Sequence, residues 1–309
     1  MSLSKEIIEI LACPRCKNNL KGFACANCSL RFPLVDGVPV LLNEANSLFK
    51  IADLTQRRQT TYRNTSRLKR TLRHLIPSIS LNVKAVENFK VFFSQLLAET
   101  ESPRVLVIGG AVAGAGFASL PPQITMVETD VALGPQTSLI CDAHDLPFQN
   151  ATFDGVVAQA VLEHVLDPAL CVREIHRVLK RGGAVYAETP FMQQVHAGRY
   201  DFTRFTHLGH RYLFRHFAEI ASGPACGPGM VLAWSYCYFL QSFFRHKLLG
   251  QAAFAFGSVT GFWLKYLDYF LVGRPNAYDA ASGYFFLGRT TDDELSGDEL
   301  IRSYKGMIY

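Results

Sequence analysis

Four cysteines near the N-terminus have the spacing of a metal site. They stand in two short motifs, CPRC and CANC, as Cys13, Cys16, Cys25 and Cys28. Two such turns that face each other supply four thiolates in the tetrahedral arrangement that zinc prefers, with no open coordination position. We expect structural zinc, because a module of about 40 residues has too small a core to fold without metal. Two disulfides or four unrelated thiols are the alternatives, which the apparent lack of a secretory signal disfavours.

A second candidate site begins at a glycine-rich turn. The apolar run VLVI at 105–108 is followed by GGAVAGAG at 109–116, which predicts a buried strand that turns tightly into a helix. Open α/β sheets hold nucleotides at such turns, although a plain strand-to-helix turn has the same pattern. The next predicted strand, 124–130, ends in Glu128 and Asp130. A carboxylate about 20 residues after the loop is placed to accept hydrogen bonds from ribose hydroxyls.

Three further segments follow in order, CDAHDLPF (141–148), FDGVVAQAVLEHV (153–165) and LKRGGAVYAETPF (179–191). Together with the glycine turn, this set resembles the class I S-adenosylmethionine (SAM)-dependent methyltransferases, in particular their type 11-like group, over residues 105–223. The resemblance implies an α/β fold with a Rossmann-like, seven-stranded, mostly parallel sheet and a helical insertion before the last strand. The last two strands, 217–220 and 283–290, are expected to pair antiparallel.

The resemblance also implies cofactor-binding residues. Gly109 and Gly110 match the glycine motif, whose backbone N–H groups approach the methionine moiety of SAM. Asp130, or failing it Glu128, matches the acid that binds the ribose. The residues implied to lie around the adenine ring and the methyl-transfer pocket are Asp142, Ala143 and Gln159.

The chain departs from the family motif at two positions. Val107 stands where an acid is usual, and Ala111 stands where a further glycine is usual. The missing acid removes a partner for the ammonium group of SAM. In the LEH motif, Glu163 and His164 have the types of catalytic residues, but we expect them to hold neighbouring loops. Residues 169–180 predict a helix that Gly182 and Gly183 end before a fifth strand at 184–188.

The segment 189–217 is dense in His, Arg and Tyr. It resembles the loop that covers the acceptor in methyltransferases of sugar and natural-product pathways. Methyl transfer requires an acceptor held in line with the methyl group and, for a hydroxyl, removal of its proton. We expect His196 to be the base, with Asp201, Arg204 and His207 as orienting or anion-binding neighbours.

Composition and resemblance divide the 309 residues into four parts. Residues 1–45 form the zinc ribbon, and its cysteine pairs and the run FPLVDGVPVLL (32–42) resemble the small zinc-ribbon subunits that activate tRNA and other methyltransferases. That resemblance implies a docking role in cis. The other parts are a basic helical connector at 46–100, a methyltransferase domain at 101–290 with an apolar helical insertion at about 222–280, and a frayed tail at 291–309.

Two stretches indicate possible partners. The connector carries eight Lys or Arg between residues 50 and 73 against one acid, which is either a solvated helix face or a surface for phosphates. The insertion has two uncharged runs, 230–244 and 248–264, each shorter than a membrane span needs. They form either a lid with a buried apolar face or an element at a bilayer surface. We expect a cytoplasmic protein with peripheral membrane contact as one alternative.

Three functions follow from these patterns. The leading hypothesis is a SAM-dependent methyltransferase that acts on an oxygen or nitrogen of a small or carrier-linked acceptor, such as a sugar, glycolipid or natural product. A tRNA or other nucleic-acid methyltransferase is less favoured, since the connector has few aromatic residues that could stack on bases. A scaffold whose cofactor site is inactive is the third, because of Val107 and Ala111. The net charge of +5 is too small to favour one of these three functions over the others.

Overall fold

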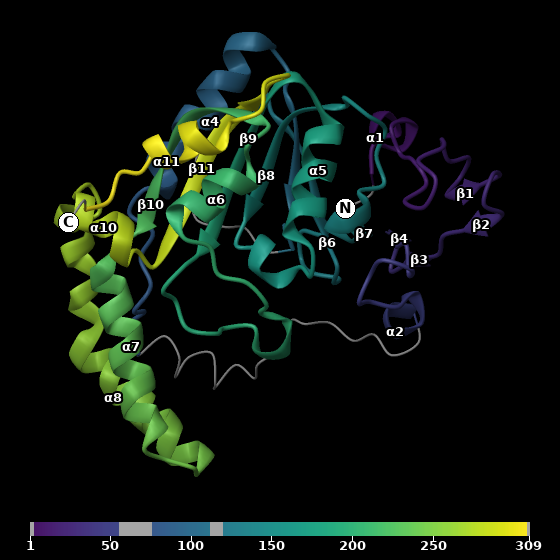
Figure 1. The fold of residues 1–309 in the computed structure, drawn as a ribbon. Helices are drawn as coiled ribbons and strands as arrows, with labels where there is room; N and C mark the ends of the chain where they lie inside the picture. Colours follow the sequence, from purple (N-terminus) through teal and green to yellow (C-terminus); the bar gives the residue numbers. More distant parts are fainter. Residues whose placement is uncertain (1–2, 56–75, 112–119, 308–309) are drawn as a thin grey trace.

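The computed structural model describes residues 3–55, 76–111 and 120–307. Its centre is a sheet of nine strands in the order β10-β11-β9-β8-β5-β6-β7-β4-β3, with helices on both faces (Figure 1). The strands of this sheet are β3 (Leu34–Val35), β4 (Val38–Leu41), β5 (Arg104–Ile108), β6 (Thr125–Asp130), β7 (Leu139–Cys141), β8 (Phe153–Gln159), β9 (Leu179–Pro190), β10 (Phe217–Cys226) and β11 (Gly283–Thr290).

The seven predicted strands are confirmed, and two more extend the sheet. Strands β7, β6, β5, β8 and β9 are parallel, whereas β11 pairs antiparallel with both β9 and β10. The additional strand β4 comes from the N-terminal part and pairs parallel with β7, with Val40 opposite Ile140. Its partner β3 then closes the edge. Without β4, the edge of β7 would have unpaired backbone N–H and C=O groups. The apolar run 32–42 forms hydrogen bonds with this edge and so becomes part of the large sheet.

Two apolar layers enclose the sheet, because successive strand residues point to opposite faces. On β5, Leu106 and Ile108 belong to one core, and Val105 and Val107 belong to the other. The helix α5 (Pro168–Val178) covers the first core, and α4 (Ala85–Glu99) covers the second with Phe89, Phe92 and Leu96. The predicted helix at 169–180 ends two residues early, since β9 already begins at Leu179.

The remaining elements are short, apart from a pair of long helices near the C-terminus. They are β1 (Ala24–Cys25), β2 (Leu30–Arg31), α1 (Lys5–Glu9), α2 (Ile51–Thr55), α6 (His207–Leu213), α7 (Pro228–Ser242), α8 (Lys247–Gly261), α9 (Asp268–Leu271), α10 (Pro275–Ala280) and α11 (Gly297–Arg302), with the 3₁₀ turns η2 (Ala143–Asp145), η3 (Leu162–His164), η4 (Gly198–Tyr200) and η5 (Phe262–Leu267).

The N-terminal part packs directly on the large sheet. Ile7, Leu11 and Phe32 share one apolar core with the residues under α5. At its rim the Nζ of Lys17 donates to Oε2 of Glu174 at 2.8 Å. Because these groups lie at an interface between segments distant in sequence, the ribbon is fixed relative to the sheet by both apolar and charged contacts.

The apolar insertion is a helical hairpin, α7 and α8, that projects from the body (Figure 1). It begins at Pro228, later than the predicted residue 222, because β10 continues to Cys226 to pair along β11. The buried carboxylate of Asp268 accepts hydrogen bonds from three N–H groups at the start of α7, those of Gly227, Gly229 and Met230, at 2.7 to 3.0 Å. Among the described residues, no helix has the length and apolarity that crossing a bilayer requires.

Two further expectations concern the connector and the tail. The connector shows α2 and α4, while the basic residues from Arg57 to Arg73 lie outside the described residues. The expected fraying of the tail is wrong for α11, where Ser296 and Glu299 form a reciprocal capping box. That arrangement satisfies two N–H groups that a helix start otherwise leaves without partners.

Candidate functional site

The four N-terminal cysteines come together as predicted. Their Sγ atoms all lie within 4.8 Å of one another, and Cys16 Sγ is 3.5 Å from Cys25 Sγ, so they are free thiols and not disulfides. Each CxxC turn is followed by a residue in the left-handed region, Lys17 with φ 60° and Ser29 with φ 53°. Four sulfurs about 2.3 Å from one zinc ion are about 3.8 Å apart, so this donor set fits zinc.

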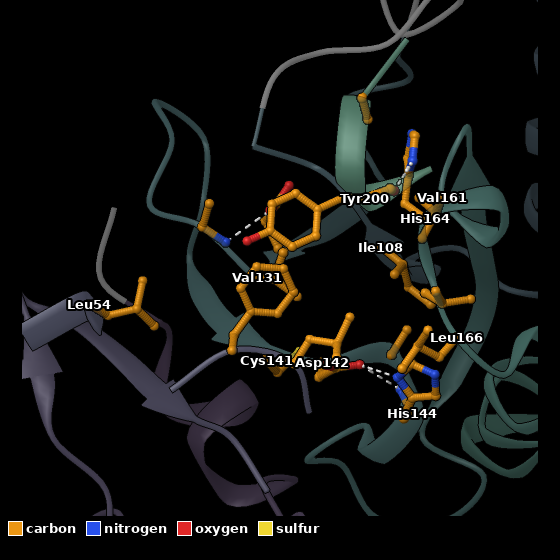
Figure 2. Close-up of a pocket in the computed structure, with 18 of the residues that line it drawn as sticks. Leu54, Ile108, Val131, Cys141, Asp142, His144, Val161, His164, Leu166 and Tyr200 are labelled. Atoms are coloured by element: carbon orange, nitrogen blue, oxygen red, sulfur yellow. Dashed lines mark hydrogen bonds and ion pairs between the residues drawn. The ribbon is translucent and has the colours of Figure 1, made fainter. Parts of the chain in front are cut away.

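A cavity of about 860 Å³ lies at the carboxyl ends of β5, β6, β7 and β8 (Figure 2). Gly109 lines it directly after β5, with φ 73°. A Cβ at this position would lie 2.6 Å from Cγ2 of Val161, which also lines the cavity. The turn therefore needs glycine for its backbone angle and for its close approach to Val161.

Of the two acids on β6, only Asp130 reaches the described cavity wall. Its Oδ1 accepts from the N–H of Ala132 at 2.9 Å, and its Oδ2 accepts from the N–H of Ala111 at 3.3 Å. Burial raises the pKa of Asp130, and these hydrogen bonds oppose the shift. Since a carboxylate has about four acceptor positions, Asp130 keeps acceptor capacity for a ligand hydroxyl. Glu128 instead accepts from the hydroxyl of Ser138 at 3.1 Å.

Two other predicted cofactor residues have different contacts from those expected. The N–H of Gly110 donates to the carbonyl of Thr129 at 2.9 Å and is therefore engaged within the sheet. A Cβ on Gly110 would lie 3.1 Å from Cβ of Glu128, so this glycine serves close packing. Gln159 donates through Nε2 to the buried carboxylate of Glu188 at 2.9 Å, and does not line the cavity as the structure describes it. The rest of the glycine loop, 112–119, lies outside the described residues.

Asp142 and Ala143 line the cavity, and Figure 2 shows the contact of Asp142 with His144. Its Oδ1 lies 2.6 Å from Nδ1 of His144, and its Oδ2 accepts from the hydroxyl of Ser47 at 2.6 Å. Nε2 of His144 accepts from the N–H of Asp167 at 3.1 Å, so Nδ1 carries the proton. Burial raises the pKa of Asp142, but the hydrogen bonds from His144 and Ser47 outweigh it and lower the pKa below its usual range.

The segment just after the ribbon also lines the cavity, which its sequence does not indicate. Leu48, Phe49, Lys50, Asp53 and Leu54 all line the cavity. The ring of Phe49 stacks on that of Tyr200 from the 191–206 segment, with centroids 5.7 Å apart. These residues carry no motif, and only the pairing of β4 with β7 brings them here. The N-terminal part therefore forms one wall of the candidate cofactor site.

A cluster of titratable groups stands beside the cavity end that His164, Ala197 and Tyr200 line. After β8 the chain turns at Ala160, with φ 54°, into η3, which carries Glu163 and His164. Glu163 is fully buried, and burial raises its pKa to about 8. Its Oε1 lies 3.6 Å from Nε2 of His164 and 3.7 Å from Nε2 of His196.

Two of the predicted acceptor-site residues, His196 and Asp201, meet in this cluster. The backbone N–H of His196 donates to Oδ2 of Asp201 at 3.0 Å, and its Nδ1 lies 3.5 Å from the same oxygen. Arg204 donates to both oxygens of Asp201, one of them at 2.7 Å from Nη2. Although burial raises the pKa of Asp201, the hydrogen bonds from Arg204 lower it to about 2.

His207, the third predicted residue, is placed elsewhere. It begins α6, and its Nε2 lies 3.2 Å from the hydroxyl of Ser222 on β10. Its ring packs against Tyr278 and Tyr284. Burial lowers its pKa to about 4, so it is neutral at pH 7. His207 therefore does not lie beside His196 as expected, and is instead a buried residue that connects α6 to the antiparallel strands.

Two parts of the chain are similar to known proteins. A family model described as a methyltransferase domain matches residues 120–187. The 2-methyl-6-phytyl-1,4-hydroquinone methyltransferase 1 of Oryza sativa subsp. japonica is 40% identical over 63 residues, which are 20% of this chain and 19% of that protein. The match therefore spans about a fifth of this curated relative. Phosphoethanolamine N-methyltransferase 2 of Haemonchus contortus is 16% identical, with a TM-score of 0.43 over 67% of this chain and 53% of that chain.

The other match concerns the ribbon. A UPF0434 protein of Shewanella denitrificans is 44% identical over 55 residues, which are 16% of this chain and 98% of that protein. A UPF0434 protein of Nitrosococcus oceani is 40% identical over 48 residues and 81% of its length. The chain therefore belongs to the UPF0434 family through its N-terminal cysteine segment and carries a class I methyltransferase domain fused to it.

Proposed function

We propose that the chain is a SAM-dependent methyltransferase that acts on an oxygen or nitrogen of a carrier-linked acceptor. The observation that carries this proposal is the cavity at the carboxyl ends of β5 to β8, which the Gly109 turn lines and where Asp130 keeps free acceptor positions. SAM supplies a methyl group on a positively charged sulfur, which a nucleophile held in line can take directly. The four cysteines would hold zinc as a structural ion that fixes the wall around Phe49.

The described residues suit a nucleoside at three points. Asp130 can accept hydrogen bonds from ribose hydroxyls at the end of β6. The cavity wall at Asp142 and Ala143 is rigid, because His144 and Ser47 hold the carboxylate. The aromatic pair of Phe49 and Tyr200 provides apolar surface for a flat ring.

The acceptor would enter beside the cluster of Glu163, His164 and His196, whose side chains can bind a hydroxyl or amine. The segment carrying His196 is also held by the hairpin. The hydroxyl of Tyr238 on α7 donates to the carbonyl of Val195 at 2.9 Å, and Gln194 donates to the hydroxyl of Ser235 at 3.0 Å. The hairpin and the acceptor segment are therefore parts of one structure.

The hairpin exposes far more apolar surface than a solvated helix pair needs. Phe239, Phe243 and Phe256 are 61%, 67% and 60% exposed, and Phe270 on the following helix α9 is 76% exposed. Arg245 in the turn between α7 and α8 is exposed, as is Lys247 at the start of α8. Apolar rings beside basic side chains are typical of elements that rest on an anionic bilayer. The rice relative is named for a hydroquinone with a phytyl chain, which supports a lipid-linked acceptor for this chain.

Two measurements test the proposal. Calorimetry with SAM and S-adenosylhomocysteine should show one saturable site, and absence of any binding would overturn the methyltransferase assignment. Flotation with vesicles containing phosphatidylglycerol should carry the chain to the top fraction. The double variant Phe243→Ser with Phe256→Ser should stay at the bottom, while the control Ile301→Ser, on exposed α11, should float like the wild type. Equal flotation of all three proteins would contradict the role of the hairpin.

A further inference from the structure

The carboxylate of Glu163 is buried without a hydrogen-bond partner. The residue has no exposed surface, and neither Oε1 nor Oε2 makes a hydrogen bond to any described residue. Its backbone is well used, since the carbonyl accepts from the N–H of Phe202 at 2.8 Å. A buried carboxyl group costs free energy unless it is hydrogen-bonded or paired with a cation. The carboxyl group of Glu163 is therefore buried with no hydrogen-bond partner among the described residues.

Two imidazole nitrogens face this carboxylate. Oε1 of Glu163 lies 3.6 Å from Nε2 of His164 and 3.7 Å from Nε2 of His196, and the three ligand atoms lie within 4.8 Å of one another. These separations are too long for hydrogen bonds. Two ligands that bind one zinc ion at tetrahedral angles, each about 2.0 to 2.1 Å from it, are about 3.3 Å apart. The two separations from Glu163 are thus within a few tenths of an ångström of those between metal ligands.

An oxygen atom lies near Nδ1 of each imidazole, as is usual for histidines that bind a metal ion through Nε2. Nδ1 of His164 lies 2.8 Å from the carbonyl oxygen of Tyr200, which can only accept, so Nδ1 carries the proton and Nε2 keeps its lone pair. Nδ1 of His196 lies 3.5 Å from the carboxylate of Asp201. The carbonyl of Tyr200 therefore fixes the tautomer of His164, and the carboxylate of Asp201 lies close behind the imidazole of His196.

We propose that Glu163, His164 and His196 bind a divalent transition-metal ion, of which zinc is the reference, separate from the four-cysteine site. Two imidazoles and one carboxylate are a ligand set that leaves a coordination position open, unlike the closed set of four cysteines. His164 also lines the cavity, so the open position faces the end where an acceptor would enter. The sequence predicts only loop-holding roles for Glu163 and His164, and a proton-accepting role for His196.

The binding of the ion does not depend on the proposed function, although its use does. If the chain is a methyltransferase, the ion would hold an acceptor oxygen beside the methyl group, and Nε2 of His196 would be a ligand instead of the base. Arg204 contributes the nearby positive charge, but both oxygens of Asp201 engage it. A cation bound at the three ligands therefore meets the unpaired carboxylate of Glu163.

The test uses the full chain with zinc already in its ribbon, titrated with cobalt chloride and followed by calorimetry and absorption. We expect one further equivalent of cobalt, with visible ligand-field bands and without the near-ultraviolet sulfur-to-cobalt band that cysteine ligands give. Glu163→Gln and His196→Asn should each weaken this binding by about 100-fold or more, since even outer-shell changes cost 10 to 100-fold. His246→Asn, a change of an exposed histidine on the hairpin, should leave it unchanged.

Several outcomes would overturn the proposal. One is a wild-type chain that takes up no cobalt beyond the ribbon. Another is equal affinity in the wild type, Glu163→Gln and His196→Asn. His196 has a side chain that is 26% exposed, so its variant should fold even if the buried change at Glu163 does not. Calorimetry with S-adenosylhomocysteine on the same samples separates this result from a failure of the proposed function, because neither Glu163 nor His196 lines the cofactor cavity as the structure describes it.

Discussion

The two acids on β6 give the sharpest test of which residues hold the cofactor. Both belong to the strand end that the sequence singles out, but only Asp130 lines the cavity, whereas Glu128 is bound to Ser138. We compare Asp130→Asn with Glu128→Gln, which keep the shape of each side chain and remove its charge. The amide oxygen of the Asp130 variant can still accept from the N–H of Ala132.

The expected magnitude follows from the free acceptor positions of Asp130. A hydrogen bond to a charged group contributes about 1.5 to 3 kcal/mol, and 1.4 kcal/mol corresponds to a tenfold change in an equilibrium constant. Calorimetry at pH 7.5 should therefore show that Asp130→Asn raises the Kd of S-adenosylhomocysteine about 10- to 150-fold. Glu128→Gln should stay within about twofold of the wild type. Equal losses in both variants, with unchanged thermal unfolding, would refute the assignment of the ribose acid.

Four further changes test other parts of the structure. Phe49→Ala removes one ring of the stacked pair over the cavity and should weaken cofactor binding by about 1 kcal/mol, roughly fivefold by calorimetry. Cys16→Ser should lower bound zinc by one equivalent in elemental analysis and weaken cofactor binding too, since the ribbon positions that wall. Burial lowers the pKa of His210 to about 3, so the folded protein excludes the proton that the unfolded chain binds, and the free energy of unfolding decreases as pH falls below about 6.5. Urea unfolding measures this decrease between pH 7.5 and 5.0, and His210→Gln should make it smaller by about 2 kcal/mol. Asp268→Ala leaves three buried N–H groups unpaired, and should cost about 3 kcal/mol and speed hydrogen exchange in α7.

Much of the central sheet could be predicted, because its signals are local. The run VLVI before two glycines predicts a buried strand and a turn, and β5 ends at Ile108 as expected. The two CxxC pairs likewise predict the four-cysteine cluster, since the two cysteines of each pair lie on a single tight turn. In these cases the residues that interact are close in sequence or carry a spacing that few other structures share.

The missed features depend on contacts between distant segments. Nothing near Ser47 or Phe49 indicates that they meet Asp142 and Tyr200, because the pairing of β4 with β7 decides that placement. Gly110 matches a binding motif, but its N–H is engaged by Thr129 on the next strand. A motif specifies residue types, whereas burial and neighbouring strands decide which of them face a ligand.

The central claim is that the cavity at the carboxyl ends of β5 to β8 holds the adenosyl part of SAM. A crystal structure of the chain grown with S-adenosylhomocysteine tests this most directly. The account predicts ribose hydroxyls bound to Asp130, the adenine beside Ala143 and Phe49, and the sulfur directed toward His164. A nucleoside bound elsewhere on the chain, or a cavity that stays without it at saturating concentration, would contradict the account.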